Sequence, residues 1–417
     1  MKPIEKIKIS KDLLFFLAYT IIVLLPNYFS HSLLSLLDNA FLIFGFCFLF
    51  LKRYKPSKSI LLITSFYVYL IIITFINGTD TANVHIITSN AKIIFYLANL
   101  DYFLKNKQRS TINILFYFIT FVVLLDFVIL LLYPNGWYFT ENVYNEWTTT
   151  YVPQWLLGNK NNHTLWYILA IYLSCIRCIG ENKKRHWFIS LFLMIVSLVA
   201  MLLLKSTTSI VVVFIVGIGV FFWLFRKKSF KWIPNIYILL VCYLVLLILI
   251  LCGITYFLSP IVEGIFGKDL TFTSRTIIWG RVFEQIQISP LFGSGQFSDE
   301  YTSSILESLA FVNAHNQYLQ ILWQTGIIGL LIYVLFIFNI TSGIKRETNN
   351  NLKFLKLVIF FALLLKFIFE VEISLNCWMV FLLLAQRFNA MAKIPFKEKG
   401  GKSEKCKKLI FNLERQY

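Results

Sequence analysis

Long apolar segments recur along almost the whole chain, and they restrict its fold more than any other feature. About twelve of them, each of roughly 18 to 22 residues, are long enough to cross a hydrocarbon core of about 30 Å as helices. The 417 residues are 58% hydrophobic and 14% charged, with a mean hydropathy of +0.70. Because a soluble domain cannot bury that much apolar surface, we predict an all-α polytopic membrane protein.

The net charge of +18 is segregated rather than spread evenly. Basic clusters occur in alternate loops, the pattern that the positive-inside rule predicts for about twelve spans with both termini in the cytoplasm. We therefore expect the basic face to meet anionic membrane lipids, and we expect no nucleic acid partner. The clusters between spans are Lys52–Lys58, Lys105–Arg109, Lys183–Arg185, Arg226–Lys231 and Lys345–Lys356.

This topology divides the chain into four parts. Spans one to nine occupy residues 1–258 with an aromatic external loop at 133–163, a large external loop covers 259–316, spans ten to twelve occupy 317–391, and a basic cytoplasmic tail covers 392–417. The predicted spans are approximately 13–29, 33–51, 59–76, 85–104, 112–133, 164–180, 186–204, 208–226, 235–258, 317–340, 353–370 and 373–391.

The large external loop contains Arg275, Arg281 and His315 on the side where cations are otherwise scarce. The sequence predicts a helix from Ser274 to Gln287 with Arg275 in its first turn. Free backbone N–H groups and the helix dipole favour an anion there, so a guanidinium would complete a phosphate site. Trp279 shares the face of Arg275, whereas Arg281 points away from it.

A second helix is expected to begin near Asn313 and to continue into span ten, with His315 in its first turn and Tyr318 on the same face. The positive end of a helix disfavours the imidazolium, so we expect a neutral His315 that can accept a proton as a general base. From position alone, a histidine that packs at a helix start and bonds a neighbouring loop is an equally good interpretation.

Polar residues inside the spans leave two interpretations open. A charge at the bilayer centre costs about 3 kcal/mol on insertion scales, so it needs a partner or a cavity. Lys92 could pair with Asp126 and Lys366 could extend to the interface; alternatively, Lys92 lines an outward-facing groove for a lipid diphosphate. Lys205, in the short external turn between spans seven and eight, has no acidic neighbour in sequence and is a further candidate for substrate contact.

The aromatic external loop is typical of an interfacial belt, and its flat side chains would also suit stacking on sugar rings. It ends in the polar turn LLGNKNN, which includes Lys160 and lies at the outer end of span six. Candidate contacts for the glycan are therefore Lys160 together with Trp279, Asn316 and Tyr318 of the large loop.

Three motifs in order, S-R-x-x-x-W, S-P-L-F-G-S-G and A-H-N-Q-Y-L-Q-x-L-x-x-x-G-x-x-G, begin at Ser274, Ser289 and Ala314. This region, roughly 200–335, resembles the signature region of the O-antigen ligase and polymerase (Wzy) superfamily, and LLGNKNN resembles a segment of the polymerases. The resemblance implies a bacterial inner-membrane glycosyltransferase that uses a polyprenyl-diphosphate-linked oligosaccharide and no cofactor. It implies that Arg275 binds the diphosphate and that His315 lies near the acceptor hydroxyl.

The chain departs from the family pattern before span eight, where the family often has an Arg. Here Lys205 would have to replace it, offering charge without the bidentate fork of a guanidinium. The expected reaction is metal-independent and inverting: Arg275, with Lys205, Arg281 or Lys92, binds the diphosphate, and His315 deprotonates the acceptor.

Polymerase and ligase differ in acceptor, and the GNKN element favours a polymerase that works with flippase and chain-length regulator proteins. A ligase would transfer the glycan to a lipid core instead. A transporter or flippase of lipid-linked sugars would predict two similar halves with broken spans at matching places, a pattern that the sequence does not show.

Overall fold

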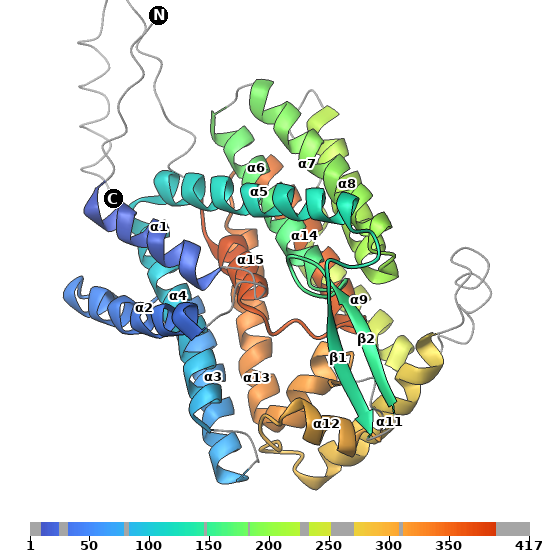
Figure 1. Ribbon diagram of the computed structural model, residues 1–417. Coiled ribbons are helices and arrows are strands. Elements are labelled where there is room, and N and C mark those ends of the chain that lie inside the picture. The colour runs from blue at the N-terminus through green and yellow to red at the C-terminus, as the bar shows by residue number, and fades with distance from the viewer. Residues whose placement is uncertain are drawn as a thin grey trace, which may run out of the picture.

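The computed structural model describes residues 10–24, 32–78, 83–145, 148–181, 184–225, 233–251, 271–307 and 312–388, and these are mainly helical (Figure 1). The predicted basic tail and residues 252–270, which include the end of predicted span nine and the first part of the large loop, lie outside the described residues. The elements are α1 (Lys11–Val23), α2 (Ser32–Leu51), α3 (Lys58–Ile76), α4 (Asn83–Asn106), α5 (Gln108–Leu132), β1 (Tyr138–Asn145), β2 (Thr148–Gln154), α6 (His163–Glu181), α7 (Lys184–Leu203), α8 (Thr207–Phe225), α9 (Ile236–Leu251), α11 (Thr271–Ile288), α12 (Asp299–Ile305), α13 (Gln317–Lys345), α14 (Asn350–Phe369) and α15 (Leu375–Ala385).

Each predicted span coincides with a helix, namely α1 to α9 and α13 to α15. Among the described residues, six helices are long and apolar enough to cross a membrane: α3, α5, α6, α7, α8 and α13. Shorter apolar stretches lie in α2, α9 and α15. The polytopic helical class is therefore confirmed, and the count of twelve crossings stays a prediction.

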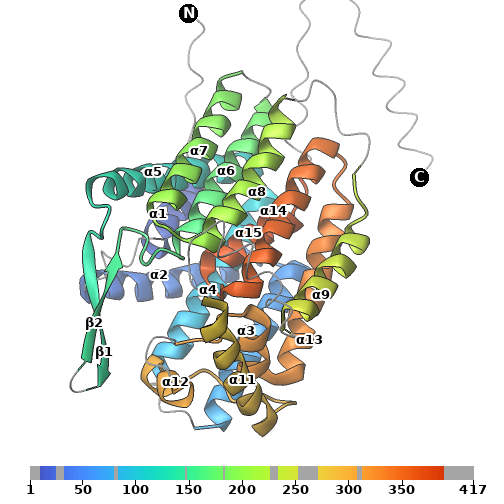
Figure 2. The ribbon, with the colours of Figure 1, turned by 90° about the vertical axis from the view of Figure 1, so that its right-hand side faces the viewer.

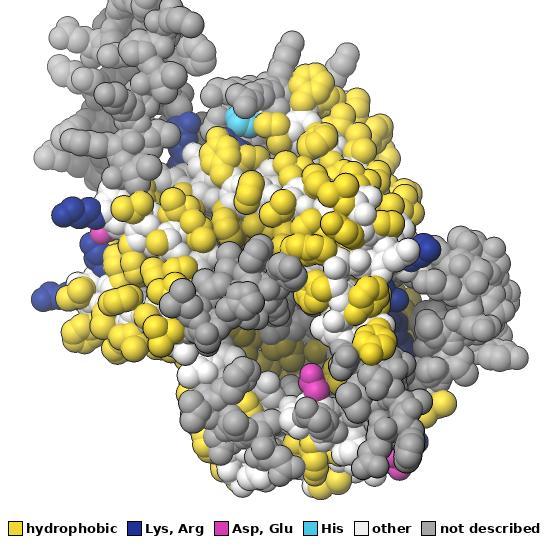
Figure 3. Space-filling model, in the orientation of Figure 1, with side chains coloured by type: hydrophobic (Ala, Val, Ile, Leu, Met, Phe, Trp, Pro, Cys, Tyr) yellow, Lys and Arg dark blue, Asp and Glu magenta, His cyan; other side chains and the backbone are white. Residues whose placement is uncertain are grey.

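The helices pack around α15, whose residues from Cys377 to Leu384 are all buried. Helix α13 lies beside α3, and α14 contacts α6, α8 and α9 on the other side of α15 (Figures 1 and 2). Helices α2 and α5 run crosswise to α3 in both views. Hydrophobic side chains cover much of the helical surface in Figure 3, as expected for contact with lipid.

Helix α13 contains a sharp break at Gly326, where φ is 59° and ψ is −165°. In a straight helix Tyr318 and Tyr333 would lie about 22 Å apart along the axis. Their ring centroids are 6.3 Å apart, so segment 317–325 folds back along segment 327–345. The helix also begins at Gln317, with Asn316 as its N-cap. The prediction of a helix that starts near Asn313 and continues into span ten is therefore wrong at both points.

The S-P-L-F-G-S-G motif supports this break. The N–H groups of Ser294 and Gly295 donate to the carbonyls of Trp323 and Gln324 at 2.9 Å, and Ile327 N–H donates to Pro290 O at 2.9 Å. A Cβ on Gly326 would lie 2.4 Å from Leu291 O. The motif therefore has a structural role, which is to hold the two parts of α13 in their folded-back arrangement.

The aromatic external loop forms an antiparallel hairpin of β1 and β2 that projects from the helices (Figure 2). Phe139 and Tyr151 are exposed on it, whereas Trp155 is buried and its Nε1 donates to Tyr133 O at 2.8 Å. The aromatic side chains of this loop therefore divide between exposed positions and an anchor to the end of α5.

Candidate functional site

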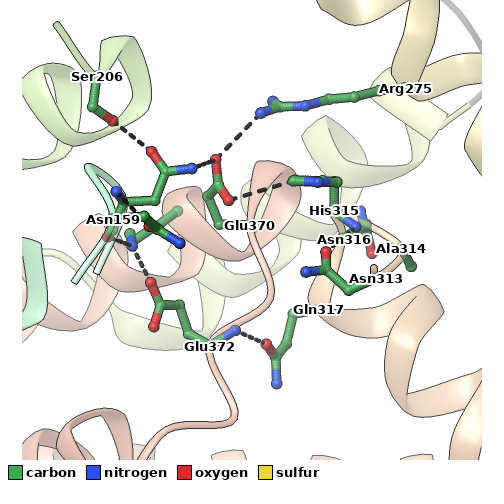
Figure 4. A network of polar contacts seen from close by, with 12 residues as sticks. Asn159, Ser206, Arg275, Asn313, Ala314, His315, Asn316, Gln317, Glu370 and Glu372 are labelled. Atoms are coloured by element: carbon green, nitrogen blue, oxygen red, sulfur yellow. Dashed lines mark hydrogen bonds and ion pairs between the residues drawn. The ribbon is translucent and has the colours of Figure 1, made fainter. Parts of the chain in front are cut away.

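The carboxylate of Glu370 joins the two residues that the sequence assigned to catalysis. Arg275 Nη2 donates to Glu370 Oε1 at 3.2 Å, and His315 Nδ1 lies 3.6 Å from Glu370 Oε2 (Figure 4). Asn161 Nδ2 also donates to Oε1, at 3.1 Å. Four separate parts of the chain thus meet here: α11, the start of α13, the link after α14 and the turn before α6.

These side chains are largely buried yet accessible from one side. The exposed fraction is 15% for Arg275, 17% for His315 and 9% for Glu370, so a substrate group could reach them while bulk water is mostly excluded. Burial acts to raise the pKa of Glu370, but the contact with His315 and the charges of Lys366 and Arg275 hold that pKa below its ordinary value. Glu370 is therefore ionised at neutral pH.

Helix α11 positions Arg275 through Trp279. The indole Nε1 of Trp279 donates to the carbonyl of Ala314 at 3.1 Å, directly before His315, and both Trp279 and Val282 are buried. Arg275 lies four residues before Trp279, on the same face, as the sequence predicted. Helix α11 begins at Thr271, however, so Arg275 lies in its second turn, and its predicted place in the first turn, beside the free backbone N–H groups, is wrong.

His315 lies before α13 rather than in its first turn. Its φ is 45°, in the left-handed region, and its N–H donates to Asn313 Oδ1 at 2.9 Å. Buried Asn316 caps the helix by accepting from Tyr318 N and Leu319 N, and its Nδ2 donates to Ile368 O at 3.0 Å. The Glu370 carboxylate lies 3.6 Å from the imidazole Nδ1, a neighbour that the expected place in the first turn of a helix did not include.

A second set of polar contacts fixes the turns around Glu370. Ser206 Oγ donates to Asn161 Oδ1 at 2.9 Å, and Lys366 Nζ donates to Asn161 O at 3.0 Å. Lys366 also pairs with Glu372, whose N–H donates to Gln317 Oε1 at 2.6 Å. Lys366 is fully buried, so the prediction that it extends to the interface is wrong.

The predicted pairing of Lys92 with Asp126 is also wrong. Lys92 Nζ lies 2.5 Å from Asp38 Oδ2 of α2. Asp126 Oδ2 instead lies 2.9 Å from His163 Nδ1 and accepts from Tyr167 OH at 2.9 Å, and His163 Nε2 lies 3.3 Å from Gly158 O. This buried group anchors the turn that carries Asn161.

The other residues that the sequence predicted for the site differ in exposure and in their neighbours. Lys205 and Lys160 are exposed on the two turns that supply Ser206 and Asn161. Arg281 faces the end of α12, where it pairs with Glu307 at 2.6 Å and contacts Leu306 O. Tyr318 lies deeper, with its hydroxyl 2.8 Å from that of Tyr243.

Sequence analysis missed Glu370 and Asn161 as site residues. Glu370 was available as a carboxylate at the end of an apolar span, where its charge requires a partner. Asn161 lay in a turn already noted for its likeness to polymerases. Their relation to His315 was not predictable, because His315 is 55 positions from Glu370 and 154 from Asn161, and no local pattern links them.

Two comparisons relate this chain to known proteins. The family model described as O-antigen ligase (Wzy_C) matches residues 191–334, a range that includes Lys205, Arg275 and His315. Exopolysaccharide production protein ExoQ of Rhizobium meliloti (strain 1021) is 29% identical over 102 residues, which are 22% of this chain and 23% of that protein. The match thus spans less than a quarter of the length of that curated relative.

Proposed function

Because this chain belongs to the O-antigen ligase and polymerase superfamily, we propose that it is a membrane glycosyltransferase that polymerises oligosaccharide repeat units carried on a polyprenyl diphosphate. The observation that carries the proposal is the meeting of Arg275 and His315 at the Glu370 carboxylate. A guanidinium suited to a diphosphate and an imidazole suited to proton transfer lie within reach of one substrate.

The proposed reaction is a direct displacement that needs no metal ion. The acceptor hydroxyl oxygen attacks the anomeric carbon of the donor, and the bond from that carbon to the diphosphate oxygen breaks with its electron pair on the diphosphate. His315 takes the hydroxyl proton, and Arg275 stabilises the negative charge on the leaving group. The products are an inverted glycosidic bond and a free polyprenyl diphosphate.

Other cations differ in how well they suit the diphosphate. Lys205 precedes Ser206 in the turn that supports Asn161, so we propose it as the second cation of the site. Arg281 and Lys92 each have an acidic partner, Glu307 and Asp38, and would have to exchange it to bind substrate. For the glycan we propose Lys160 first, because its turn is exposed beside the site, and then Trp279, Asn316 and Tyr318.

We place the enzyme in the bacterial inner membrane with both termini in the cytoplasm and the site on the external side. Four connections that the positive-inside pattern assigns to that side contribute to one polar cluster: the turn before α6, the turn before α8, the large loop and the link after α14. A flippase would supply the donor there, and a chain-length regulator would act on the product.

The experiment that tests this function uses purified protein in detergent with a lipid-linked repeat unit. A ladder of longer glycans is the result expected for a polymerase. Donor loss only after a lipid core is added would instead identify a ligase. If intact, folded protein consumes no donor under either condition, the transferase proposal is wrong and transport of lipid-linked sugars becomes the better explanation.

A further inference from the structure

The carboxylate of Glu370 contacts both of the groups assigned to chemistry, Arg275 and His315. Oε1 accepts from Arg275, while Oε2 faces His315. A single negative charge is thus shared between the proposed diphosphate ligand and the proposed base. Since the donor diphosphate is itself an anion, its binding must compete with Glu370 for Arg275.

The Asn161 amide determines where the Glu370 carboxylate lies once the diphosphate has displaced it from Arg275. Asn161 Nδ2 donates to Oε1 independently of Arg275, and Asn161 is itself held by Ser206 and Lys366. The carboxylate is therefore kept in place when the guanidinium turns to the diphosphate. In this structure the Glu370 side chain is 9% exposed, so water compensates little of its charge, and His315 faces its second oxygen.

We propose that Glu370 is a positioning residue that couples donor binding to proton transfer, an inference that rests on the proposed function. In the empty site Glu370 neutralises Arg275. Once the diphosphate has taken Arg275, Glu370 orients the imidazole and serves as the counter-charge of the imidazolium that forms when His315 accepts the acceptor proton. If Nδ1–H points to Glu370, Nε2 carries the lone pair that accepts this proton.

The remaining charged groups in this cluster leave that assignment intact. Lys366 pairs with Glu372 and donates to Asn161 O, and its charge acts with that of Arg275 to keep Glu370 ionised. The turn before α6 contributes the neutral Asn161, and the start of α13 contributes the neutral Asn316 and Gln317. Glu370 is therefore the carboxylate that faces His315 in this cluster, and Arg275 shares it.

The test compares donor turnover by wild-type protein and by Glu370→Gln in detergent across pH. The amide keeps the shape but removes the charge, so it no longer competes for Arg275 and no longer balances an imidazolium. We expect KM for the donor to fall, kcat to fall by about tenfold or more, and the acidic limb of kcat to move to lower pH. A residue that only supports folding would lower kcat without also lowering KM for the donor.

Two further variants guard against a folding defect. Glu370→Asp keeps the charge, so it should leave the acidic limb near its wild-type position even if the rate falls. Arg275→Gln leaves the carboxylate to His315 already in the free protein, so the acidic limb of kcat/KM, measured with excess protein, should lie at higher pH than in wild type. Unchanged acidic limbs in all three variants, or a KM for the donor that rises while kcat falls in Glu370→Gln, would overturn the coupling.

The outcomes separate this inference from the proposed function. If wild-type protein turns over donor while Glu370→Gln shows no joint fall of KM and kcat, the coupling fails and the glycosyltransferase assignment stands. If folded wild-type protein turns over no donor at all, the proposed function fails and the coupling fails with it.

Discussion

At the scale of single residues, contacts with other side chains and with the backbone bring Arg275 and His315 together. Trp279 fixes α11 to the backbone of Ala314. The Glu370 carboxylate lies against both the guanidinium of Arg275 and the imidazole of His315. The roles of Arg275 and His315 as candidate site residues were predictable from the motifs in which they occur. Glu370 was not, because a carboxylate at a span end is ambiguous until its neighbours in space are known.

His315→Ala tests the proposed base. We expect normal expression and a donor turnover lowered by about 10² to 10⁴, because general base catalysis contributes in that range. His315→Gln should be similarly slow, since an amide does not accept the proton. Glycan synthesis in cells and donor consumption in detergent are the measurements, and wild-type product length and amount in either variant would exclude His315 as the base.

At the scale of elements, the helices follow from the apolar periodicity, but the break in α13 does not. Residues 317–340 form one apolar segment by composition, and only the φ of Gly326 and its close packing on Leu291 divide it. Asn313 and Asn316 are equally good N-caps by residue type. The structure selects Asn316 because its amide also reaches Ile368 O, a contact between distant parts of the chain.

Gly326→Ala tests that break. A methyl group would meet Leu291 O at 2.4 Å, and the positive φ adds a penalty of about 1 to 2 kcal/mol, so we expect a lower melting temperature in detergent and weaker activity. Gly280→Ala in α11 is the matched control, because its added Cβ meets nothing within 4 Å. A Gly326→Ala protein that melts like Gly280→Ala would contradict the structural role of the break.

At the scale of the whole molecule, charge distribution predicted which connections share a face. The turns at Asn161 and Ser206, the large loop and the link at Glu370 were all assigned to the external side, and they meet in one network. The pairing of buried charges was less predictable. Lys92 and Asp126 found other partners because helix packing, rather than depth in the membrane, decides which charges meet.

Cysteine labelling tests this orientation. In a background without reactive native thiols, Lys160→Cys should react with a membrane-impermeant reagent added to intact spheroplasts, because its exposed turn faces outward. Lys345→Cys, exposed at the other end of α13, should react only after the membrane is opened. Labelling of Lys345→Cys in intact spheroplasts would invert the topology and place the site in the cytoplasm.

The most direct test of the central claim measures consumption of a polyprenyl-diphosphate-linked repeat unit by purified wild-type, Arg275→Ala and Arg346→Ala proteins. Arg346 is an exposed arginine at the opposite end of α13 and serves as the control for loss of one guanidinium. We expect wild-type and Arg346→Ala to release polyprenyl diphosphate at similar rates, and Arg275→Ala to be slower by about 10² or more. Release by Arg275→Ala at the wild-type rate would contradict the proposed site.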